Sequence, residues 1–531
     1  MKQGVEQVDL SRGEIEAALA EAKPILPAGV YAKLETVVRA YLTVVRLLEG
    51  KKASLVRLRR MIFGPLSEKS RDVLGRRRRM PQEAGTKQAR EPKPGHGRNG
   101  AATYVNAKTE RVPHQRLNHG ERCPACRRGN VYKQKDRHGV LVRVTGQTPL
   151  NATVYELEKL RCGACGKVFV ARPPVEVGRR KYDEHAAAMI ALLKYGGGFP
   201  FNRLTKLQDC VGIPLPASTQ WEIVRDAARG LAPAHEELTL LAAQGKLLHN
   251  DDTTMKILER LGKPRKEGQA PGAGRTGIFT SGIVSLVKGR RVALFVTSPR
   301  HAGENLTDLL KRRDKALRPP IQMCDALSRN LPKELKTILA NCLAHGRRRF
   351  VEVAENFPEE CRYVLKLLEK VYKNDAAAKK LGLSDTARLG FHQDHSGPLM
   401  EKLLVWMQAQ FAKHKVEPNS SLGEAIGYML KHWEALTLFL RKAGAPLDNN
   451  IVERALKKAI LHRKNSLFYK TDNGARAGDL YMSLIHTCEL NGADPFDYLT
   501  RLQRNAKAVR ARPGQWLPWN YLRAPTRSPP N

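Results

Sequence analysis

Residues 246–258 read KLLHNDDTTMKIL, and two further apolar stretches follow, GIFTSGIVSLV at 277–287 and RRVALFVTSP at 290–299. Each stretch has the β-branched and apolar composition of a strand. A helical pattern, ENLTDLLKRR at 304–313, comes next, and PIQMCDALS at 320–328 indicates a fourth strand. Three strands, a helix and a further strand predict an α/β core.

Two acidic residues end strands of this core. Asp251 lies at the end of the first predicted strand and Asp325 at the end of the fourth. If these strands are neighbours, both carboxylates can reach shared cations. Hard oxygen ligands suit Mg²⁺ or Mn²⁺.

A third acid, Glu453, lies in APLDNNIVERALKKAILHRKNSLF at 445–468, where Asp448 and Asn449 can cap a helix. Glu453 shares one helix face with Lys457 and Lys464. The substrate backbone would be held by the basic residues of this helix, Lys457, His462, Arg463 and Lys464. Single acids of this kind are also common as caps or solvated charges, so spacing alone leaves both interpretations open.

The charge of the chain indicates its partner. It has 531 residues, with 92 Lys and Arg against 52 Asp and Glu, and a formal charge of +40. Such an excess favours binding to a polyanion, and nucleic acid is the natural one. The chain has no apolar run of membrane-spanning length, and its first residues, MKQGVEQVDL, lack the apolar stretch of a signal peptide. We therefore expect a cytoplasmic, nucleoid-associated protein without a membrane partner.

Four of the nine cysteines form two CxxC pairs, Cys123 with Cys126 and Cys162 with Cys165. Strand-like alternation separates the pairs, which predicts a zinc ribbon in which four thiolates hold one structural Zn²⁺. A redox role would need a thioredoxin-like context that the sequence lacks. Most of the remaining cysteines are expected to be small buried residues: Cys210, Cys324, Cys342, Cys361 and Cys488.

The N-terminal part carries an apolar residue at every seventh position, at Leu34, Tyr41, Leu48, Leu55 and Ile62. The pattern fits a short coiled coil that joins two chains, and it fits equally an amphipathic helix packed on its own domain. Residues 76–99 are basic and almost without apolar side chains, which predicts a linker. This linker can follow a phosphate backbone or serve only as a solvated tether.

Residues 201–210 and 217–229 read as two helices around a turn, with Ser218 as the cap of the second. They suggest a helix-turn-helix whose second helix directs Thr219, Gln220, Glu222 and Arg225 outward, with Gln220 and Arg225 as candidate DNA contacts. An ordinary helical pair has the same pattern. Residues 350–444 are mostly helical and too long for a connection, so we expect an insertion domain. Its aromatic residues are at helical spacing and fit a core better than base stacking: Trp406, Trp433 and Phe439.

Several motifs resemble the transposases of the insertion-sequence-66 family. They are RRMIFGPLSEKS (59–70), the paired CxxC motifs, LHNDDTTMKIL (248–258), CLAHGRRRF (342–350), LDNNIVERALKKAILHRKNSLF (447–468) and SLIHTCELNGADPFDYLTRL (483–502). They occur in family order over most of the chain. The acidic motif around Glu453 extends for about twenty residues, which makes the resemblance specific.

The resemblance implies a DNA transposase with a ribonuclease-H-like core, preceded by a zipper-like helix and a zinc-binding region. Carried over by motif, its Asp-Asp-Glu trio is Asp251, Asp325 and Glu453. Two Mg²⁺ or Mn²⁺ ions would act on one phosphodiester, one at the attacking oxygen and one at the leaving oxygen. Arg347 and Arg348 of the motif CLAHGRRRF are further candidate DNA contacts. The implied partners are the terminal inverted repeats of the element, target DNA, a second copy of the chain and accessory transposition proteins.

The chain departs from the family pattern near two of the acids. Asp252 and Thr254 stand where the family usually has Glu and Pro, and Ala326-Leu327-Ser328-Arg329-Asn330 replaces a Gly-Tyr-rich stretch after Asp325. Two other functions remain as alternatives. One is a DNA-binding regulator with an inactive core, and the other is a structure-specific nuclease or resolvase on the same fold.

The expected organisation is a multidomain α/β plus α protein. Its segments are 1–72 (helical or coiled coil), 73–110 (basic linker), 111–178 (zinc ribbon), 179–240 (helix-turn-helix region), 241–349 (first part of the ribonuclease-H-like core), 350–444 (helical insertion), 445–505 (final part of the core) and 506–531 (basic Pro-rich tail).

Overall fold

The computed structural model describes residues 12–38, 109, 112, 114–133, 141–144, 147–161, 165, 167–177, 180–261, 277–333 and 335–524. The chain divides into two compact units, one of residues 1–77 and 150–531 and one of residues 78–149. Some predictions lie outside the described residues: the linker at 76–99, the motif at 59–70, Cys162 and the seventh-residue apolar pattern beyond Leu34. Among the described residues, no helix is long and apolar enough to cross a membrane.

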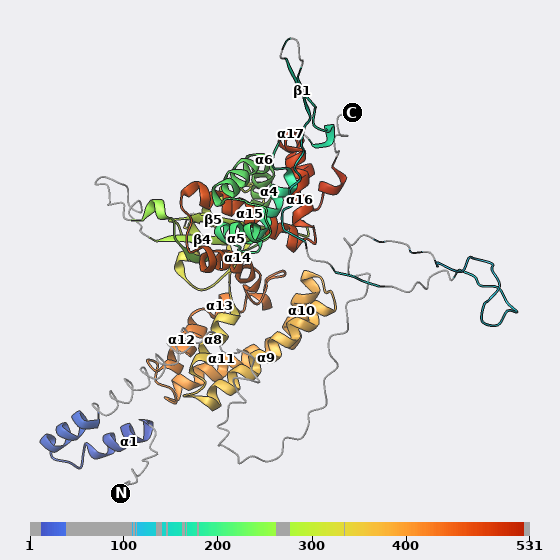
Figure 1. The fold of residues 1–531 in the computed structure, drawn as a ribbon. Coiled ribbons are helices and arrows are strands. Elements are labelled where there is room, and N and C mark those ends of the chain that lie inside the picture. Colours follow the sequence, from blue (N-terminus) through green and yellow to red (C-terminus); the bar gives the residue numbers. More distant parts are fainter. Residues whose placement is uncertain are drawn as a thin grey trace, which may run out of the picture. The chain divides into compact units, whose positions relative to one another are not determined.

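A five-stranded mixed sheet forms the centre of the larger unit (Figure 1). Its strands are β3 (Leu247–Met255), β4 (Ile278–Val287), β5 (Arg290–Ser298), β6 (Ile321–Cys324) and β7 (Ile338–Asn341). The order is β5-β4-β3-β6-β7, with β3, β4 and β5 antiparallel and with β6 and β7 parallel to β3. The first three predicted strands and the fourth are therefore confirmed, whereas the short β7 was not predicted.

Helices cover both faces of the sheet. On β4, Ser281 accepts a hydrogen bond from Asn305 of α7 (Ala302–Leu310), and Ser285 donates one to Ala242 at the end of α6 (Ala217–Ala243). Gly282 faces Leu456 of α14 (Asn450–Ser466). Because neighbouring residues of a strand point to opposite faces, α6 and α7 cover one face and α14 covers the other.

Helix α15 (Asp472–Leu490) protects the edge of the sheet along β5. The outward N–H groups of Ala293, Phe295 and Thr297 donate hydrogen bonds to Thr487, Ser483 and Asp479, which follow each other at four-residue steps on α15. An uncovered edge strand would offer these N–H groups to another chain. Further elements complete this part of the unit: α4 (Glu184–Ala191), the π-helix η3 (Leu192–Gly196), α5 (Phe201–Cys210), η4 (Leu258–Arg260), η5 (Ser328–Asn330), α16 (Pro495–Arg504), α17 (Ala506–Ala511), η7 (Pro513–Trp516) and η8 (Tyr521–Arg523).

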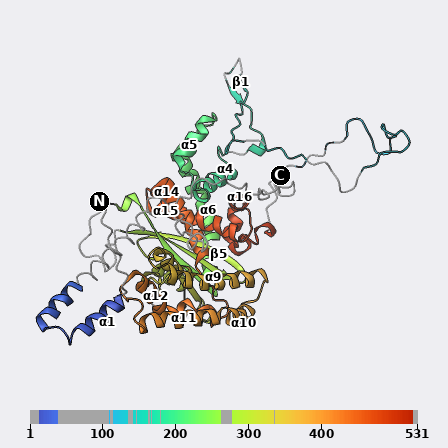
Figure 2. The ribbon, with the colours of Figure 1, turned by 90° about the horizontal axis from the view of Figure 1, so that it is seen from below.

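A second group of helices follows β7 and precedes α14 in the chain, and it shares a second hydrophobic core with residues of β3, β6 and β7 (Figure 2). It comprises α8 (Leu343–Val353), α9 (Pro358–Lys380), α10 (Asp385–His395), α11 (Gly397–Ala412), α12 (Ser421–Lys431), α13 (Trp433–Leu436) and η6 (Leu438–Leu440). Phe439 is buried in this core, and Trp406 and Trp433 pack against it. These aromatic side chains therefore contribute to folding, as their helical spacing indicated.

Two local predictions need correction. Helix α6 begins at Ala217 with Pro216 at its N-cap position, so Ser218 does not cap it, and the helix continues through Pro233 to Ala243. The expectation that most of the scattered cysteines are buried is confirmed, because four of the five are buried and only Cys210 is exposed. The predicted tail is partly folded, because Val509, Trp516 and Tyr521 are buried in the main core.

Short elements also occur near the N-terminus and in the segment that was predicted to be a zinc ribbon. They are α1 (Arg12–Ala22), the antiparallel pair β1 (Lys159–Arg161) and β2 (Val168–Val170), and η2 (Val175–Val177). Of the two strand-like stretches between the CxxC pairs, VLVRVTGQ (140–147) and ATVYELEKL (152–160), the second ends in β1, whereas the described residues 141–144, 147 and 152–158 form no strand.

Candidate active site

Asp251 and Asp325 lie on neighbouring strands. β3 and β6 run parallel, with His249 level with Met323, and two further residues in this register bring Asp251 level with Asp325. Asp325 directly follows β6, whereas Asp251 lies inside β3, because its antiparallel pairing with β4 continues as far as Met255. The sequence thus predicted the right pair of strands but placed Asp251 too near a strand end.

The surroundings of Asp251 disfavour the charged form of its carboxyl group. Burial, together with the negative charges of Asp325, Asp252 and Glu453, raises the pKa of Asp251 to about 7. Its Oδ1 accepts a hydrogen bond of 2.8 Å from the N–H of Asp252. No basic side chain in the described part of the chain forms an ion pair with Asp251. A cation bound here would stabilise the charged form of Asp251.

The adjacent Asp252, in contrast, is surrounded by basic and hydrogen-bond-donating groups. Its side chain is only 2% exposed, and its Oδ2 lies 3.0 Å from Nδ1 of His301. The N–H of Ala302 donates to the same oxygen over 3.3 Å, and Arg329 lies 3.5 Å from Oδ1. Asp252 therefore connects β3 to the start of α7, and its carboxylate is already used for structure.

Asp325 is held by the segment that departs from the family pattern. The side-chain amide of the fully buried Asn330 donates a hydrogen bond to Oδ1 of Asp325. The carbonyl oxygen of Asn330 accepts hydrogen bonds of 2.8 Å from the side chains of Asn250 and Gln322, on β3 and β6. Asp325 is thus connected through Asn330 to the sheet itself, and Arg329 of the same segment pairs with Asp252.

Asn449 fixes the start of the helix that carries Glu453. It occupies the N-cap position of α14, but its side chain makes no capping hydrogen bond. Instead its Oδ1 lies 2.9 Å from Nδ1 of His249, its Nδ2 donates to the carbonyl oxygen of Asn250, and its N–H donates to the Sγ of Cys342. Asn449 is completely buried. The motif around it therefore joins α14 to β3 and to the end of β7, rather than only capping the helix.

A glycine lets α14 approach the sheet closely. Gly282 is paired with Asp251 across β3 and β4. A Cβ atom at Gly282 would lie 3.0 Å from the Leu456 side chain and 3.2 Å from that of Val452. Because Val452 precedes Glu453, the contact at Gly282 sets how near the Glu453 carboxylate comes to Asp251.

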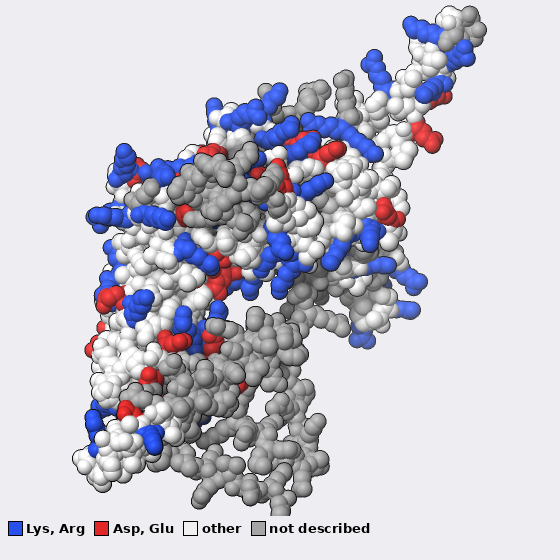
Figure 3. All heavy atoms as spheres, turned by 90° about the vertical axis from the view of Figure 1, so that its left-hand side faces the viewer, with Lys and Arg blue, Asp and Glu red and all other residues white. Residues whose placement is uncertain are grey.

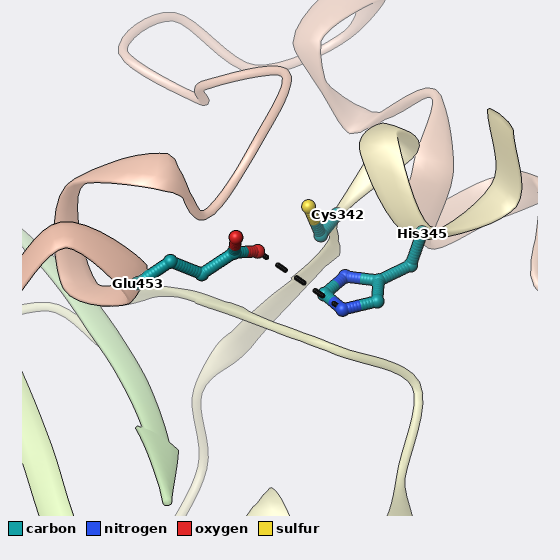
Figure 4. Close-up of side chains that lie close together, drawn as sticks. All are labelled: Cys342, His345 and Glu453. Carbon is teal, nitrogen blue, oxygen red and sulfur yellow. Dashed lines mark ion pairs between the residues drawn. The ribbon is translucent and has the colours of Figure 1, made fainter. Parts of the chain in front are cut away.

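Glu453 also lies beside a cysteine and a histidine (Figure 4). Cys342 follows β7 and His345 is in the first turn of α8, and the ligand atoms of Cys342, His345 and Glu453 lie within 4.8 Å of one another. Nε2 of His345 is 4.0 Å from Oε1 of Glu453. Nδ1 of His345 and Oε1 of Glu453 are buried atoms without a hydrogen-bond partner. These two unsatisfied atoms indicate a site that is completed by something it binds.

The sequence reasoning matched the motif CLAHGRRRF but assigned no role to Cys342 or His345. Their two-residue separation at a strand-to-helix junction was the signal that was available. Among the residues that the structure describes, no other three such ligand atoms all lie within 4.8 Å of one another. The carboxylate oxygens of Asp251, Asp325 and Glu453 therefore do not meet this distance as a group of three.

Basic side chains around these acids differ in their exposure. Lys457 and Lys464 are exposed on α14, and Arg347 and Arg348 are half-buried on α8. Arg463 donates hydrogen bonds to the Thr253 hydroxyl over 3.0 Å and to the carbonyl oxygen of Thr254 over 2.6 Å, so it fixes α14 to β3. Figure 3 shows one face of the molecule, on which many basic side chains are spread with acidic ones between them.

Two predicted DNA contacts are not on the surface. His462 is only 2% exposed, its ring stacks on Tyr469 at 4.3 Å, and burial together with Lys194 lowers its pKa to about 3. His462 is nine positions from Glu453, which is half a rotation around a helix, so it faces the core. Gln220 is fully buried, and its amide donates to Phe201, Thr205 and Leu215.

Arg225, the other predicted contact on α6, is exposed and pairs with Asp226 at 3.0 Å.

The first CxxC pair forms a tight turn. The N–H of Cys123 donates to Gly129, the N–H of Arg127 donates to Cys123, and Arg127 has a φ of 52°. Hydrogen bonds from the backbone of Gly129 and Arg128, and from Cys123, lower the pKa of the Cys126 thiol. Such N–H groups stabilise a thiolate, the form that binds metal.

Comparisons with known proteins agree with the sequence motifs. The profile of the transposase IS66 family matches residues 179–477. Three uncharacterized proteins of Sinorhizobium fredii are similar. Protein y4hP is 29% identical over 385 residues, which are 69% of this chain and 67% of y4hP. Protein y4jD is 34% identical over 188 residues, and y4qI is 31% identical over 186 residues. The matched segments are about a third of the length of each of these two relatives.

Proposed function

The chain belongs to the IS66 family of transposases, and on this premise we propose that it cuts and joins DNA at the ends of its own element, with Asp251, Asp325 and Glu453 as its catalytic carboxylates. DNA is the partner that the family implies. We further propose that the mixed sheet is a ribonuclease-H-like core. Its supporting features are three antiparallel strands followed by two parallel ones, with helices on both faces.

The main support comes from Asp251. A carboxyl group whose pKa is raised to about 7 by burial and by three neighbouring acids makes the folded state less stable near neutral pH. Asp252, one residue away, shows that this strand can hold a carboxylate with full pairing. A group without such partners, beside two other acids, is typical of a functional site.

The three carboxylates fit divalent cations of the hard type. Their donors are oxygen atoms, which suit Mg²⁺ or Mn²⁺, and we propose two such ions in the site. When bound, the cations would activate the attacking oxygen and stabilise the leaving oxygen of the phosphodiester. Cys342 and His345 offer softer donors, and we assign His345, whose Nε2 is 4.0 Å from Glu453, to orienting that carboxylate.

The residues of the chain itself hold and orient the site. Asn330 fixes Asp325, Asn449 fixes the start of α14, and Arg463 fixes its later turns on β3. The exposed Lys457 and Lys464 lie on the same face of α14 as Glu453, about one and about three turns further along, so they are placed to bind phosphates of the DNA that reaches Glu453.

Other parts of the chain would recognise and gather the DNA. We propose that the turn at Cys123 and Cys126 and the pair Cys162 and Cys165 hold one structural Zn²⁺. The helices α5 and α6 would form a DNA-reading helix-turn-helix, in which Arg225 is exposed. We also propose that the chain acts as an oligomer on paired element ends in the cytoplasm, on the bacterial nucleoid, with accessory transposition proteins as further partners.

The test uses the full chain, Mg²⁺, a linear duplex that carries both ends of the element, and a supercoiled target plasmid. A transposase cleaves at the ends and joins them to the plasmid, and EDTA abolishes both products. Cleavage without joining would instead identify a nuclease. Binding without cleavage would identify a regulator with an inactive core.

A further inference from the structure

A pocket opens directly beside Asp325. It has a volume of about 480 Å³, and three segments form its walls: the loop after β6, helix α8, and the end of helix α12. The lining residues are Asp325, Ala326, Leu327, His345, Arg348, Arg349, Glu352, Tyr428, Lys431 and His432. The pocket thus joins a proposed catalytic acid to the helical segment between the two parts of the core, for which the mechanism above has no role.

Tyr428 links that helical segment to the catalytic loop. Its side chain lines the pocket together with Asp325 and Ala326 of that loop. The guanidinium of Arg349 lies over the Tyr428 ring at 4.0 Å, and the ring of His432 is 4.9 Å away. Three planar groups therefore meet in one corner of the pocket, with the Arg349 guanidinium over the Tyr428 ring and the His432 ring tilted by 55° to it, and a further planar group can pack against them.

The pocket is also suited to a negative charge. Three cationic side chains line it, Arg348, Arg349 and Lys431, against the two acids Asp325 and Glu352. Asp325 is the acid that a metal ion would neutralise in the proposed function. With Asp325 bound to metal, positive charge exceeds negative charge on the remaining walls.

The planar and the cationic side chains of the pocket together match the base and the phosphate of a nucleotide. We propose that the pocket receives one unpaired nucleotide of the DNA strand next to the scissile phosphate. Its base would stack on Arg349, Tyr428 and His432, and its phosphate would pair with Arg348 and Lys431. A double helix is far too wide for such a pocket, so the nucleotide must leave its base pair. This inference rests on the proposed function, because it assumes that Asp325 faces the phosphate that is cut.

The pocket would compensate the cost of opening the DNA. Taking a nucleotide out of a duplex costs stacking and pairing free energy, and that cost is smallest where the base is already mismatched. Stacking on aromatic side chains recovers part of it. The strand at the scissile bond would then be held on both sides, by the carboxylates on one side and by the pocket on the other.

The experiment compares two variants on two substrates. Tyr428→Ala removes the stacking surface, whereas Tyr428→Phe keeps the ring and removes only the hydroxyl. One substrate is a fully paired duplex with an element end. The other is the same duplex with a mismatch at the position that flanks the cleavage site. Rates of Mg²⁺-dependent cleavage are measured for both, and thermal unfolding shows that each variant is folded.

We expect Tyr428→Ala to cleave the paired duplex roughly 5- to 150-fold more slowly than the parent chain. The mismatched duplex should restore most of this loss, and Tyr428→Phe, which keeps the ring, should lose far less than Tyr428→Ala on the paired duplex. An equal loss on both substrates, or an equal loss in both variants, would mean that Tyr428 only positions the Asp325 loop and would overturn the proposal. Unchanged cleavage by Tyr428→Ala would overturn it as well.

A binding measurement separates this inference from the proposed function. In Ca²⁺, the affinity for the mismatched duplex should fall by roughly the same factor in Tyr428→Ala, and it should fall in Lys431→Gln more steeply at low salt. If the parent chain cleaves no DNA, the proposed function fails, while this measurement still decides whether the pocket binds an unpaired nucleotide. Equal affinity of the parent and Tyr428→Ala in Ca²⁺ rules the pocket out.

Discussion

Replacing Asp251 with Asn should make the metal-free protein more stable at pH 8. The pKa of Asp251 is raised from 3.8 to about 7 by burial and by neighbouring acids. Below pH 4 the carboxyl group is protonated in both the folded and the unfolded chain, and it does not lower the stability of the folded state. As the pH rises towards 7, the unfolded chain releases this proton and the folded chain keeps it, so the folded state loses stability.

The size of the effect follows from the shift. With about 1.4 kcal/mol for each pKa unit, the penalty reaches at most about 4 kcal/mol at pH 8 and about half of that at pH 5. Asn cannot ionise and removes the penalty. The variant should therefore gain more stability at pH 8 than at pH 5, and it should lose the stabilisation that Mg²⁺ gives the parent chain.

The assay is urea unfolding in EDTA at both pH values, followed by tryptophan fluorescence. Asp479 is a second buried acid whose pKa is raised to about 7, by burial, but it is present in both proteins, so the difference between them isolates Asp251. Asp252→Asn is the matched control. It disturbs the contacts with His301 and Arg329 and should lower stability by about 1–3 kcal/mol. A destabilised Asp251→Asn at pH 8 would refute the reasoning, because Asp251 would then be paired like its neighbour.

Three further predictions concern other parts of the molecule. Gly282→Ala places a Cβ atom 3.0 Å from Leu456 and should displace α14. It should slow cleavage about tenfold or more, and it should lower the free energy of unfolding by about 1–3 kcal/mol. Gly390→Ala, which meets nothing within 4 Å, is its control in the same cleavage and unfolding assays. Purified chain should contain about one zinc by elemental analysis, and Cys126→Ser should lose it without unfolding the mixed sheet. Non-specific DNA binding should weaken steeply as salt rises, because of the +40 charge, and a flat salt profile in a titration would contradict this.

The sequence predicted those parts of the fold whose pattern is local. The strands β3, β4, β5 and β6 and the helix α7 were recognisable because each has a complete apolar pattern of its own. β7 has only four residues, and it is a strand because β6 lies beside it. β6 is equally short, but Pro320 and Asp325 bound its run, whereas the apolar residues of β7 are followed after one residue by α8 and are not set apart from that helix in the sequence.

In the candidate site, too, the sequence predicted the residues with local motifs but not the contacts between distant residues. Asp251, Asp325 and Glu453 stood out as acids in strong motifs, and the motif of Asn449 suggested a helix cap. The real contacts of Asn449 are with His249 and Asn250, about two hundred residues earlier in the chain. Contacts over such separations are set by tertiary packing, so neither the role of Asn449 nor the approach of His345 to Glu453 follows from local spacing.

Whether a residue of α14 is exposed could be predicted only from its angular position around the helix relative to Glu453. Lys457 and Lys464 are on the exposed side of α14 as expected, whereas His462 faces the core. The burial of Gln220 depends on how α6 packs against α5, which its own helical pattern does not specify.

The most direct test of the account is Glu453→Gln, with DNA cleavage and DNA binding measured side by side. The substitution keeps the size of the side chain and removes the charge that would hold a cation beside Asp251 and Asp325. The account predicts a folded protein that binds element-end DNA at least as tightly as the parent and neither cleaves nor joins it in Mg²⁺. Asp448→Asn, which alters only an acceptor for the N–H of Asn450, should keep its activity. Cleavage by Glu453→Gln at the parent rate would contradict the account, because cleavage would then not depend on the Glu453 carboxylate.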